Sequence, residues 1–208
     1  MAEYSFRTIA APAEGQYREK GSRFLAFAYP VETEAEINAH LSILEKKFFD
    51  ARHHCFAWML GPEKKSFRAN DDGEPNHSAG DPILGQIRSR DLTDILVVVV
   101  RYFGGVKLGV GGLITAYKAA AGDAFRHAEI IEREVRGTVE IIYDYGATAE
   151  VMRLVKEFDL AIDRQRFEAN CQLTARFKLR DRGQLFEKLG LLEAMGIKVQ
   201  YRSTLRNT

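Results

Sequence analysis

A glycine-rich segment with a single lysine is the part of the sequence best suited to hold an anion. Residues 104–112 read Gly-Gly-Val-Lys-Leu-Gly-Val-Gly-Gly and lie between a β-branched apolar run and a run with helical spacing. A glycine turn that opens a helix exposes backbone N–H groups at the positive end of the helix, where phosphate binds well. The predicted anion and nucleic-acid site comprises these glycines, nearby cations and one aromatic residue: Arg101, Tyr102, Gly104, Gly105, Lys107, Gly109, Gly111, Gly112 and Lys118.

The same glycines have a purely structural explanation. Glycine in a turn between a strand and a helix often serves only to reach positive φ or to let the helix pack closely. The segment also lacks the glycine spacing of a dinucleotide fingerprint, and no Gly-Lys-Ser/Thr sequence follows for a P-loop. The pattern therefore predicts an anion site and leaves its ligand open.

Two further clusters carry imidazole, thiol and carboxylate groups, which can bind zinc or transfer protons. One is the run 52–55 and the other is the acidic run 71–75. Neighbouring histidines on a strand face opposite sides, and no zinc-ligand spacing occurs, so we expect neither a metal nor another cofactor. The structural alternative for the acidic run is a solvated turn whose side chains cap backbone N–H groups. Cys55 could be a nucleophile beside His53 or His54, and its alternative is a buried, inert thiol. The predicted polar cluster beside the glycine segment consists of Arg52, His53, His54, Asp71, Asp72 and Glu74.

The elements that position these motifs follow from the hydrophobic pattern. Ile95–Val100 is a continuous apolar run and predicts a strand buried on both faces. Apolar residues then recur at helical spacing from Leu113 to Ala128 and predict a helix. Upstream, the pattern predicts strands at 4–9, 23–29 and 55–60, helices at 33–48 and 82–88, a polar turn at 13–16 and a polar loop at 70–80.

The charged run 129–134 is predicted to end that helix and to hold a domain boundary, giving domains 1–133 and 134–208. The second block reads as strand, helix, strand, strand, helix, strand, which is the ferredoxin-like split βαβ order. A secondary basic face is predicted there, because residues two apart on a strand share one face. It consists of Arg176, Lys178 and Arg180, and a solvated sheet face is its alternative.

Length and composition are those of a soluble globular protein of one large or two small domains. The chain has 208 residues, 46% of them hydrophobic, and a net charge of +1, so a nucleic-acid surface would have to be a local patch. It has no apolar run long enough to span a membrane and no signal-peptide pattern at its start. With only two cysteines, far apart, we expect reduced thiols and a cytoplasmic protein.

Several runs together resemble the signature of the Impact/YigZ family. The longest reaches from Gly80 to Gly109, and the others are Arg52-His53-His54-Cys55, Asp71-Asp72-Gly73-Glu74-Pro75 and Gly111-Gly112-Leu113 with Ala116-Tyr117. The resemblance covers essentially the whole chain, because the second block is similar to the C-terminal domain of bacterial YigZ-type members.

The resemblance implies an α+β fold of two domains. The first is expected to be an α/β sandwich like domain four of elongation factor G and a ribosomal small-subunit protein. The second is expected to be ferredoxin-like, as in domain five of that factor. Eukaryotic relatives regulate translation by competing for the activator of a starvation kinase, and bacterial members have been suggested to bind nucleic acid. By analogy, this implies a link to RNA or the ribosome.

Three functions remain open at this point. The first is a non-catalytic, translation-related regulator that binds RNA, the ribosome or a regulatory protein, with base stacking on Tyr102 or Phe103. The second is an enzyme acting on a phosphorylated small molecule, with Asp71, Asp72 or Glu74 as base or magnesium ligand. The third is a pure protein-interaction module. Salt-sensitive affinity, a closed pocket and an exposed apolar patch are their respective signatures.

Overall fold

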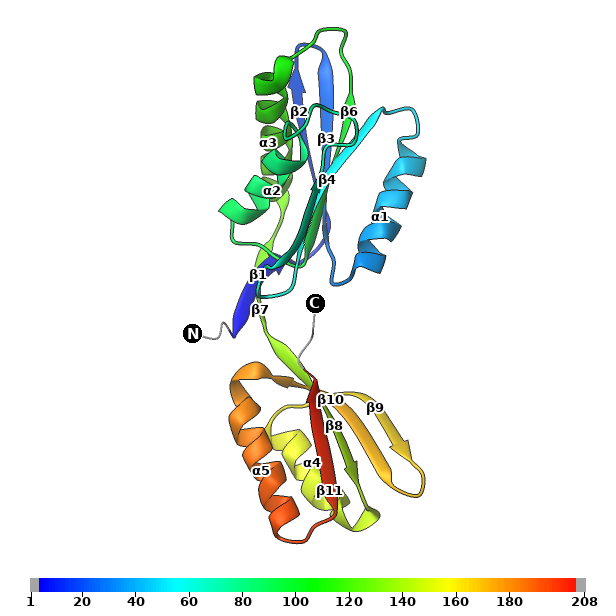
Figure 1. Cartoon of the computed structure of the whole chain (residues 1–208), viewed down its shortest axis with the longest axis vertical. Helices are drawn as coiled ribbons and strands as arrows, with labels where there is room; N and C mark the ends of the chain where they lie inside the picture. The colour runs from blue at the N-terminus through cyan, green and yellow to red at the C-terminus, as the bar shows by residue number, and fades with distance from the viewer. Residues whose placement is uncertain (1–3, 205–208) are drawn as a thin grey trace. The chain divides into compact units, whose positions relative to one another are not determined.

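The computed structural model describes residues 4–204, and these form two compact units (Figure 1). The first unit is Phe6–Arg133, and the second holds the described residues from Glu134 onward together with Tyr4 and Ser5. Both units mix helices with antiparallel sheets, as the predicted α+β class requires. The assignment of 1–133 and 134–208 as separately folding domains stays a prediction.

The first unit is built on a five-stranded antiparallel sheet of order β2-β3-β6-β4-β5. Its strands are β2 (Ala13–Glu19), β3 (Ser22–Pro30), β4 (His53–Leu60), β5 (Ser66–Asn70) and β6 (Ile95–Tyr102). Helix α1 (Glu34–Lys47) lies on one face, and α2 (Gly80–Ser89) and α3 (Gly109–His127) lie on the other (Figure 1). This is the predicted α/β sandwich.

Strand β6 is the central strand, and the prediction that it is buried on both faces is confirmed. Val97 and Val99 join the core beneath α2 and α3, whereas Leu96, Val98 and Val100 join the core beneath α1. All five side chains are fully buried. An apolar run in every position is what a strand covered by helices on both sides needs.

Three segments of this unit differ from the sequence-based prediction. The polar turn predicted at 13–16 is the first half of strand β2. No strand was predicted between residue 60 and the loop at 70–80, but β5 lies there. The charged run 129–134 contains strand β7 (Ile130–Glu134), which pairs with β1 (Ser5–Ile9) in a separate two-stranded sheet. Each strand is short and mostly half-exposed, so it lacks the apolar alternation on which strand prediction depends.

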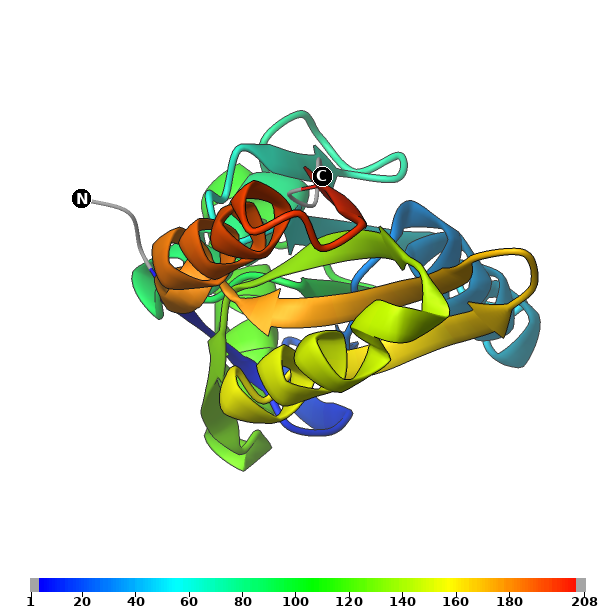
Figure 2. The ribbon, with the colours of Figure 1, turned by 90° about the horizontal axis from the view of Figure 1, so that it is seen from below.

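The second unit has the predicted ferredoxin-like order. Its strands are β8 (Arg136–Tyr143), β9 (Ala161–Phe167), β10 (Cys171–Lys178) and β11 (Val199–Thr204), arranged β11-β8-β10-β9. Helices α4 (Thr148–Glu157) and α5 (Arg182–Ala194) pack on one face of this sheet around a single core. The β9–β10 hairpin projects at one edge of the unit (Figure 2).

Candidate functional site

The acidic run 71–75 is folded into a turn by the carboxylate of Asp71. That carboxylate accepts hydrogen bonds from the backbone N–H groups of His77 (2.8 Å), Ala79 (2.9 Å) and Gly80 (2.8 Å). Burial raises the pKa of Asp71, but these three backbone donors outweigh it and hold the pKa below its usual value. Asp71 therefore works as a structural anion at the start of α2.

Strand β4 meets this turn, so the two polar motifs that were distinguished in the sequence form one cluster. His53 places its Nδ1 atom 2.8 Å from the carbonyl oxygen of Asp72. The backbone N–H of His54 donates to Asp72 Oδ2 at 2.6 Å. The histidine and acidic runs therefore lie in contact, while a binding role for this cluster stays a prediction. Arg52, the remaining member of the cluster, is exposed.

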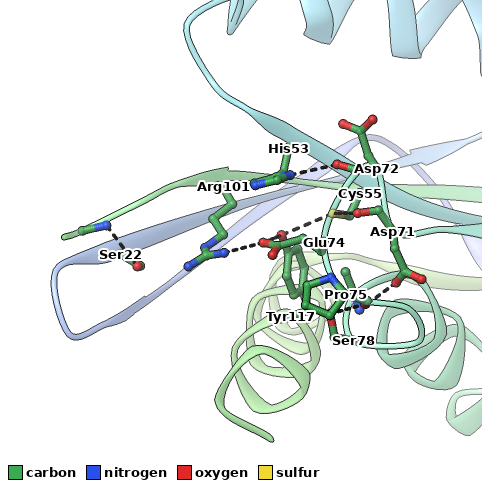
Figure 3. Close-up of polar contacts among 12 residues, drawn as sticks. Ser22, His53, Cys55, Asp71, Asp72, Glu74, Pro75, Ser78, Arg101 and Tyr117 are labelled. Carbon is green, nitrogen blue, oxygen red and sulfur yellow. Dashed lines mark hydrogen bonds and ion pairs between the residues drawn. The ribbon is translucent and has the colours of Figure 1, made fainter. Parts of the chain in front are cut away.

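Glu74 is the centre of the cluster, and it is buried. Its carboxylate forms an ion pair with Arg101 of β6 at 2.6 Å, and the side chains of Arg101 and Glu74 are only 8% and 4% exposed. The hydroxyl of Tyr117, on α3, donates to the same Glu74 oxygen at 2.8 Å. Figure 3 shows the two side chains converging on Glu74. Since Arg101 precedes the glycine segment and Tyr117 follows it, Glu74 links both ends of that segment.

Cys55 lies beside this network and is not suited to act as a nucleophile. Its Sγ lies 3.0 Å from the carbonyl oxygen of Asp71 and 3.3 Å from the hydroxyl oxygen of Tyr117 (Figure 3). Burial raises the pKa of the Cys55 thiol far above its usual range, although the hydrogen bond with Tyr117 opposes the rise. Burial and contact with Cys55 and Glu74 likewise raise the pKa of Tyr117. A thiol kept protonated is inert.

The glycine segment rests on the β2–β3 hairpin at one point and is open elsewhere. A Cβ atom at Gly104 would lie 1.9 Å from the carbonyl carbon of Gly21, so the two backbones touch. The N–H of Gly104 donates to Ser22 Oγ at 3.1 Å (Figure 3). By contrast, a Cβ at Gly105, Gly109 or Gly111 would meet nothing within 4 Å.

Helix α3 begins at Gly109 without a side-chain cap and without an acidic residue in its first turn. The N–H groups of a first helical turn have no partner within the helix, so this end carries partial positive charge. This matches the predicted form of an anion site, while anion binding itself stays a prediction.

Exposed apolar side chains surround the open part of the segment. Phe103 is 56% exposed, and Val106 and Val110 are each 51% exposed. Val110, Ile114 and Lys118 follow one another at four-residue intervals, so they form a stripe along one face of α3. We call the exposed side chains of this region the glycine-loop surface: Phe103, Val106, Lys107, Val110, Ile114 and Lys118.

Two of the predicted binding residues have other roles. Arg101 was expected to supply mobile positive charge, and this is wrong, because the side chain is buried against Glu74 and the ring of Phe24. Tyr102 is half-buried; its hydroxyl donates to Asp50 at 2.7 Å and Arg23 lies over its ring. Phe103 is the aromatic residue that faces solvent. Lys107 and Lys118 are exposed and form no ion pair within residues 4–204.

The predicted secondary basic face is partly wrong. Arg176 and Lys178 lie on β10, but the strand ends at Lys178 and Arg180 belongs to the following 3₁₀ turn. All three cations are paired: Arg176 with Asp163, Lys178 with Glu134 and Asp159, and Arg180 with Glu134 and Asp181.

Ser22, Gly21 and the polar role of Tyr117 were missed in the sequence. Tyr117 falls on the apolar face of its helix and reads as a core residue, but a buried tyrosine hydroxyl needs a partner, which was the available signal. Across residues 4–204, no three His, Cys, Asp or Glu side chains come together as metal ligands. In the same span, no helix is both long and apolar enough to cross a membrane.

Comparison with known proteins identifies the family. The family model for the Impact N-terminal domain matches residues 20–125. The chain belongs to the IMPACT family. The IMPACT family member YvyE of Bacillus subtilis is 31% identical over 169 residues, which are 81% of this chain and 78% of that protein. An IMPACT family member of Haemophilus influenzae is 33% identical over 83% of this chain and 84% of its own length.

The fold of this IMPACT family member also occurs in a solved structure. A crystal structure described as that of a hypothetical protein superposes with a TM-score of 0.77 at 26% identity. The match covers 99% of this chain and all of the other. The family resemblance and the two-part α+β fold expected from the sequence are therefore both confirmed.

Proposed function

We propose that this protein is a translation-related regulator that acts by binding, without a catalytic step of its own. We further propose that it docks a protein component of translation through the glycine-loop surface. Membership of the IMPACT family supports the regulatory part, since the resemblance implies a role in translation. The docking part is argued from the surface itself.

The observation that carries the proposal is the exposure of apolar side chains on a rigid support. Phe103, Val106 and Val110 are each more than half exposed within eight consecutive residues. Exposed apolar side chains that lie close together often mark a protein interaction surface, whereas single scattered ones are common on any protein. The surface combines an exposed aromatic side chain with aliphatic side chains, and both an aromatic residue and apolar area are typical of protein interfaces.

The support beneath this surface also favours binding over catalysis. The carboxylates of Asp71 and Glu74, and the thiol of Cys55, are engaged in hydrogen bonds or ion pairs that hold the turn, β6 and α3 together. Groups held in this way stiffen the segment between Arg101 and Tyr117. A rigid loop loses little conformational entropy on docking, which favours affinity.

The test is site-specific photocrosslinking in cells. A photoreactive phenylalanine analogue replaces Val110 in the glycine-loop surface, and in a matched control it replaces Ile43, an exposed apolar residue on α1 (59% exposed). We expect a discrete protein adduct at position 110 that is absent at position 43, and its mass-spectrometric identification as a ribosomal protein, a translation factor or a factor regulator.

The adduct should disappear when Val106→Asp is added, because a carboxylate in the apolar patch must be desolvated on docking. Adducts of equal yield at positions 43 and 110 would refute the docking surface. An RNA adduct at position 110 would replace the protein partner with RNA, for which Phe103 and the two lysines offer stacking and charge. An adduct with a protein unrelated to translation would refute the regulatory role.

A further inference from the structure

The sheet of the second unit has one face that its helices leave open. Helices α4 and α5 both pack on the other face, where Cys171, Leu173, Ala175 and Phe177 of β10 are buried. Figure 1 shows both helices on the same side of this sheet. Because side chains alternate along a strand, the remaining residues of β10 point to the open face.

The register of the sheet places polar side chains in two rows across this face. Opposite residues in an antiparallel pair point to the same side of the sheet. One row therefore runs Arg166, Gln172, Ile142, Gln200, and the next runs Arg164, Thr174, Glu140, Arg202. The two rows contain one apolar residue, one carboxylate and no aromatic ring.

Free positive charge is concentrated at the β9 edge of these rows. Arg202 pairs with Glu140, and Arg176 pairs with Asp163 at 3.0 Å. The ladder shifts register beside Thr174, and Asp163 is the residue of β9 that the shift leaves over. The carboxylate of Asp163 thus pairs with Arg176. Arg164 and Arg166 are both exposed, and neither forms an ion pair within residues 4–204.

We propose that this open face binds the phosphate backbone of RNA, with Arg164 and Arg166 as its principal contacts. A guanidinium group matches two phosphate oxygens at once, and uncharged donors such as Thr174 and Gln172 commonly add contacts to phosphate and sugar. Arg164 and Arg166 lie about 6.7 Å apart along the strand, and Arg202 lies about 14 Å away across three strand spacings.

Charge and composition favour this ligand over a protein. A single Ile142 offers too little apolar area for a protein interface, and the absence of aromatic rings from both rows leaves no platform for base stacking. The face should therefore bind RNA without reading its sequence. This proposal goes beyond the docking of a protein at the glycine-loop surface, because it concerns another unit and another ligand.

The test is fluorescence-anisotropy titration of the full chain with a labelled single-stranded RNA, over a series of salt concentrations. The key variant is Arg164→Ala/Arg166→Ala. The matched control is Arg153→Ala/Lys156→Ala on α4, which removes two equally unpaired, exposed cations from the helix side of the same unit. Circular dichroism confirms that each variant is folded, which we expect because none of the four side chains is buried.

We expect wild type and control to bind with the same affinity. The Arg164→Ala/Arg166→Ala variant should lose at least about tenfold in affinity at low salt. The slope of its log K against log salt concentration should also be smaller in magnitude by about 1.4, because each lost phosphate contact removes about 0.7 for a single strand. Oligo-U and oligo-A should bind within a few-fold of each other.

The proposal would be overturned by any of four results in this titration. They are no binding by the wild type at low salt, an equal loss in the control, a large preference for one base, and binding of poly-glutamate as tight as that of RNA. A loss caused by Lys107→Ala/Lys118→Ala instead of the sheet variant would assign RNA to the glycine-loop surface and also overturn it. The crosslinking test at position 110 is independent of the first four outcomes, so the two proposals can fail separately.

Discussion

Replacing Arg101 with methionine should destabilise the first unit severely, although the residue lies next to an exposed loop. The substitution leaves the carboxylate of Glu74 buried, with only the hydroxyl of Tyr117 as a hydrogen-bond donor. Removing one partner of a buried ion pair costs about 3–5 kcal/mol, because the other charge stays desolvated. A domain of this size has only about 5–15 kcal/mol of stability, so the loss is a large part of the total.

A double-mutant cycle shows whether the pair is responsible. Glu74→Leu alone should cost a similar amount, since it leaves Arg101 as an unpaired buried cation. The double variant Arg101→Met/Glu74→Leu should cost less than the sum of the two, by about 2–3 kcal/mol, because neither charge is then left alone. Arg101→Lys, which keeps the positive charge but not the planar geometry, should lose less than Arg101→Met.

The assay is urea unfolding followed by tryptophan fluorescence. The chain has one tryptophan, Trp58, which is buried in β4, so its emission reports on the first unit and not on the second. Circular dichroism follows both units together. If Arg101→Met unfolds at the same urea concentration as the wild type, or if the two single losses add up in the double variant, Glu74 and Arg101 do not hold the glycine segment.

Three further predictions test other parts of the structure. Gly15→Ala should destabilise the protein by about 1–3 kcal/mol in the same urea assay, because a Cβ there would lie 2.1 Å from the backbone nitrogen of Ala124 on α3. Gly85→Ala is the control, and it should stabilise the protein slightly, because a Cβ at this position of α2 would meet nothing within 4 Å. Cys55 should resist alkylation by iodoacetamide in the native protein, as followed by mass spectrometry, because burial raises its pKa; modification at the rate of a free thiol would contradict this. Asp71→Asn should lower the urea midpoint at neutral pH. The folded pKa of Asp71 is lowered, so its stabilisation is lost as acid protonates it, and the difference between variant and wild type should shrink below about pH 4; a difference that does not change with pH would contradict the assigned role.

The parts of the fold that were predictable have a strong hydrophobic pattern. The short β-branched run Ile95–Val100 favours a fully buried strand, and the alternation of strands and helices after Arg136 favours the ferredoxin-like order. Strands β2, β5 and β7 were missed for the opposite reason. Their residues are mainly polar or half-exposed, and they are strands because neighbouring strands supply hydrogen bonds, which no local pattern reveals.

The candidate site was predictable in its parts but not in its electrostatics. The histidine and acidic runs were identified from residue types, and their contact through Asp72 agrees with the hypothesis that they form one cluster. The burial of Arg101 was not foreseeable, because an arginine at the end of a strand is normally exposed. Only the tertiary fold brings Glu74, 27 residues earlier in the chain, to its guanidinium group.

The pairing of β1 with β7 has a consequence for the order of events during synthesis. Residues 5–9 leave the ribosome early, but their partner strand, Ile130–Glu134, is made more than 120 residues later. Strand β2 pairs early with β3, but the helix that covers it is completed almost as late, since Gly15 packs against Ala124 near the end of α3. The first unit therefore closes late in translation, and until then β1 presents an unpaired backbone edge that a chaperone would have to protect.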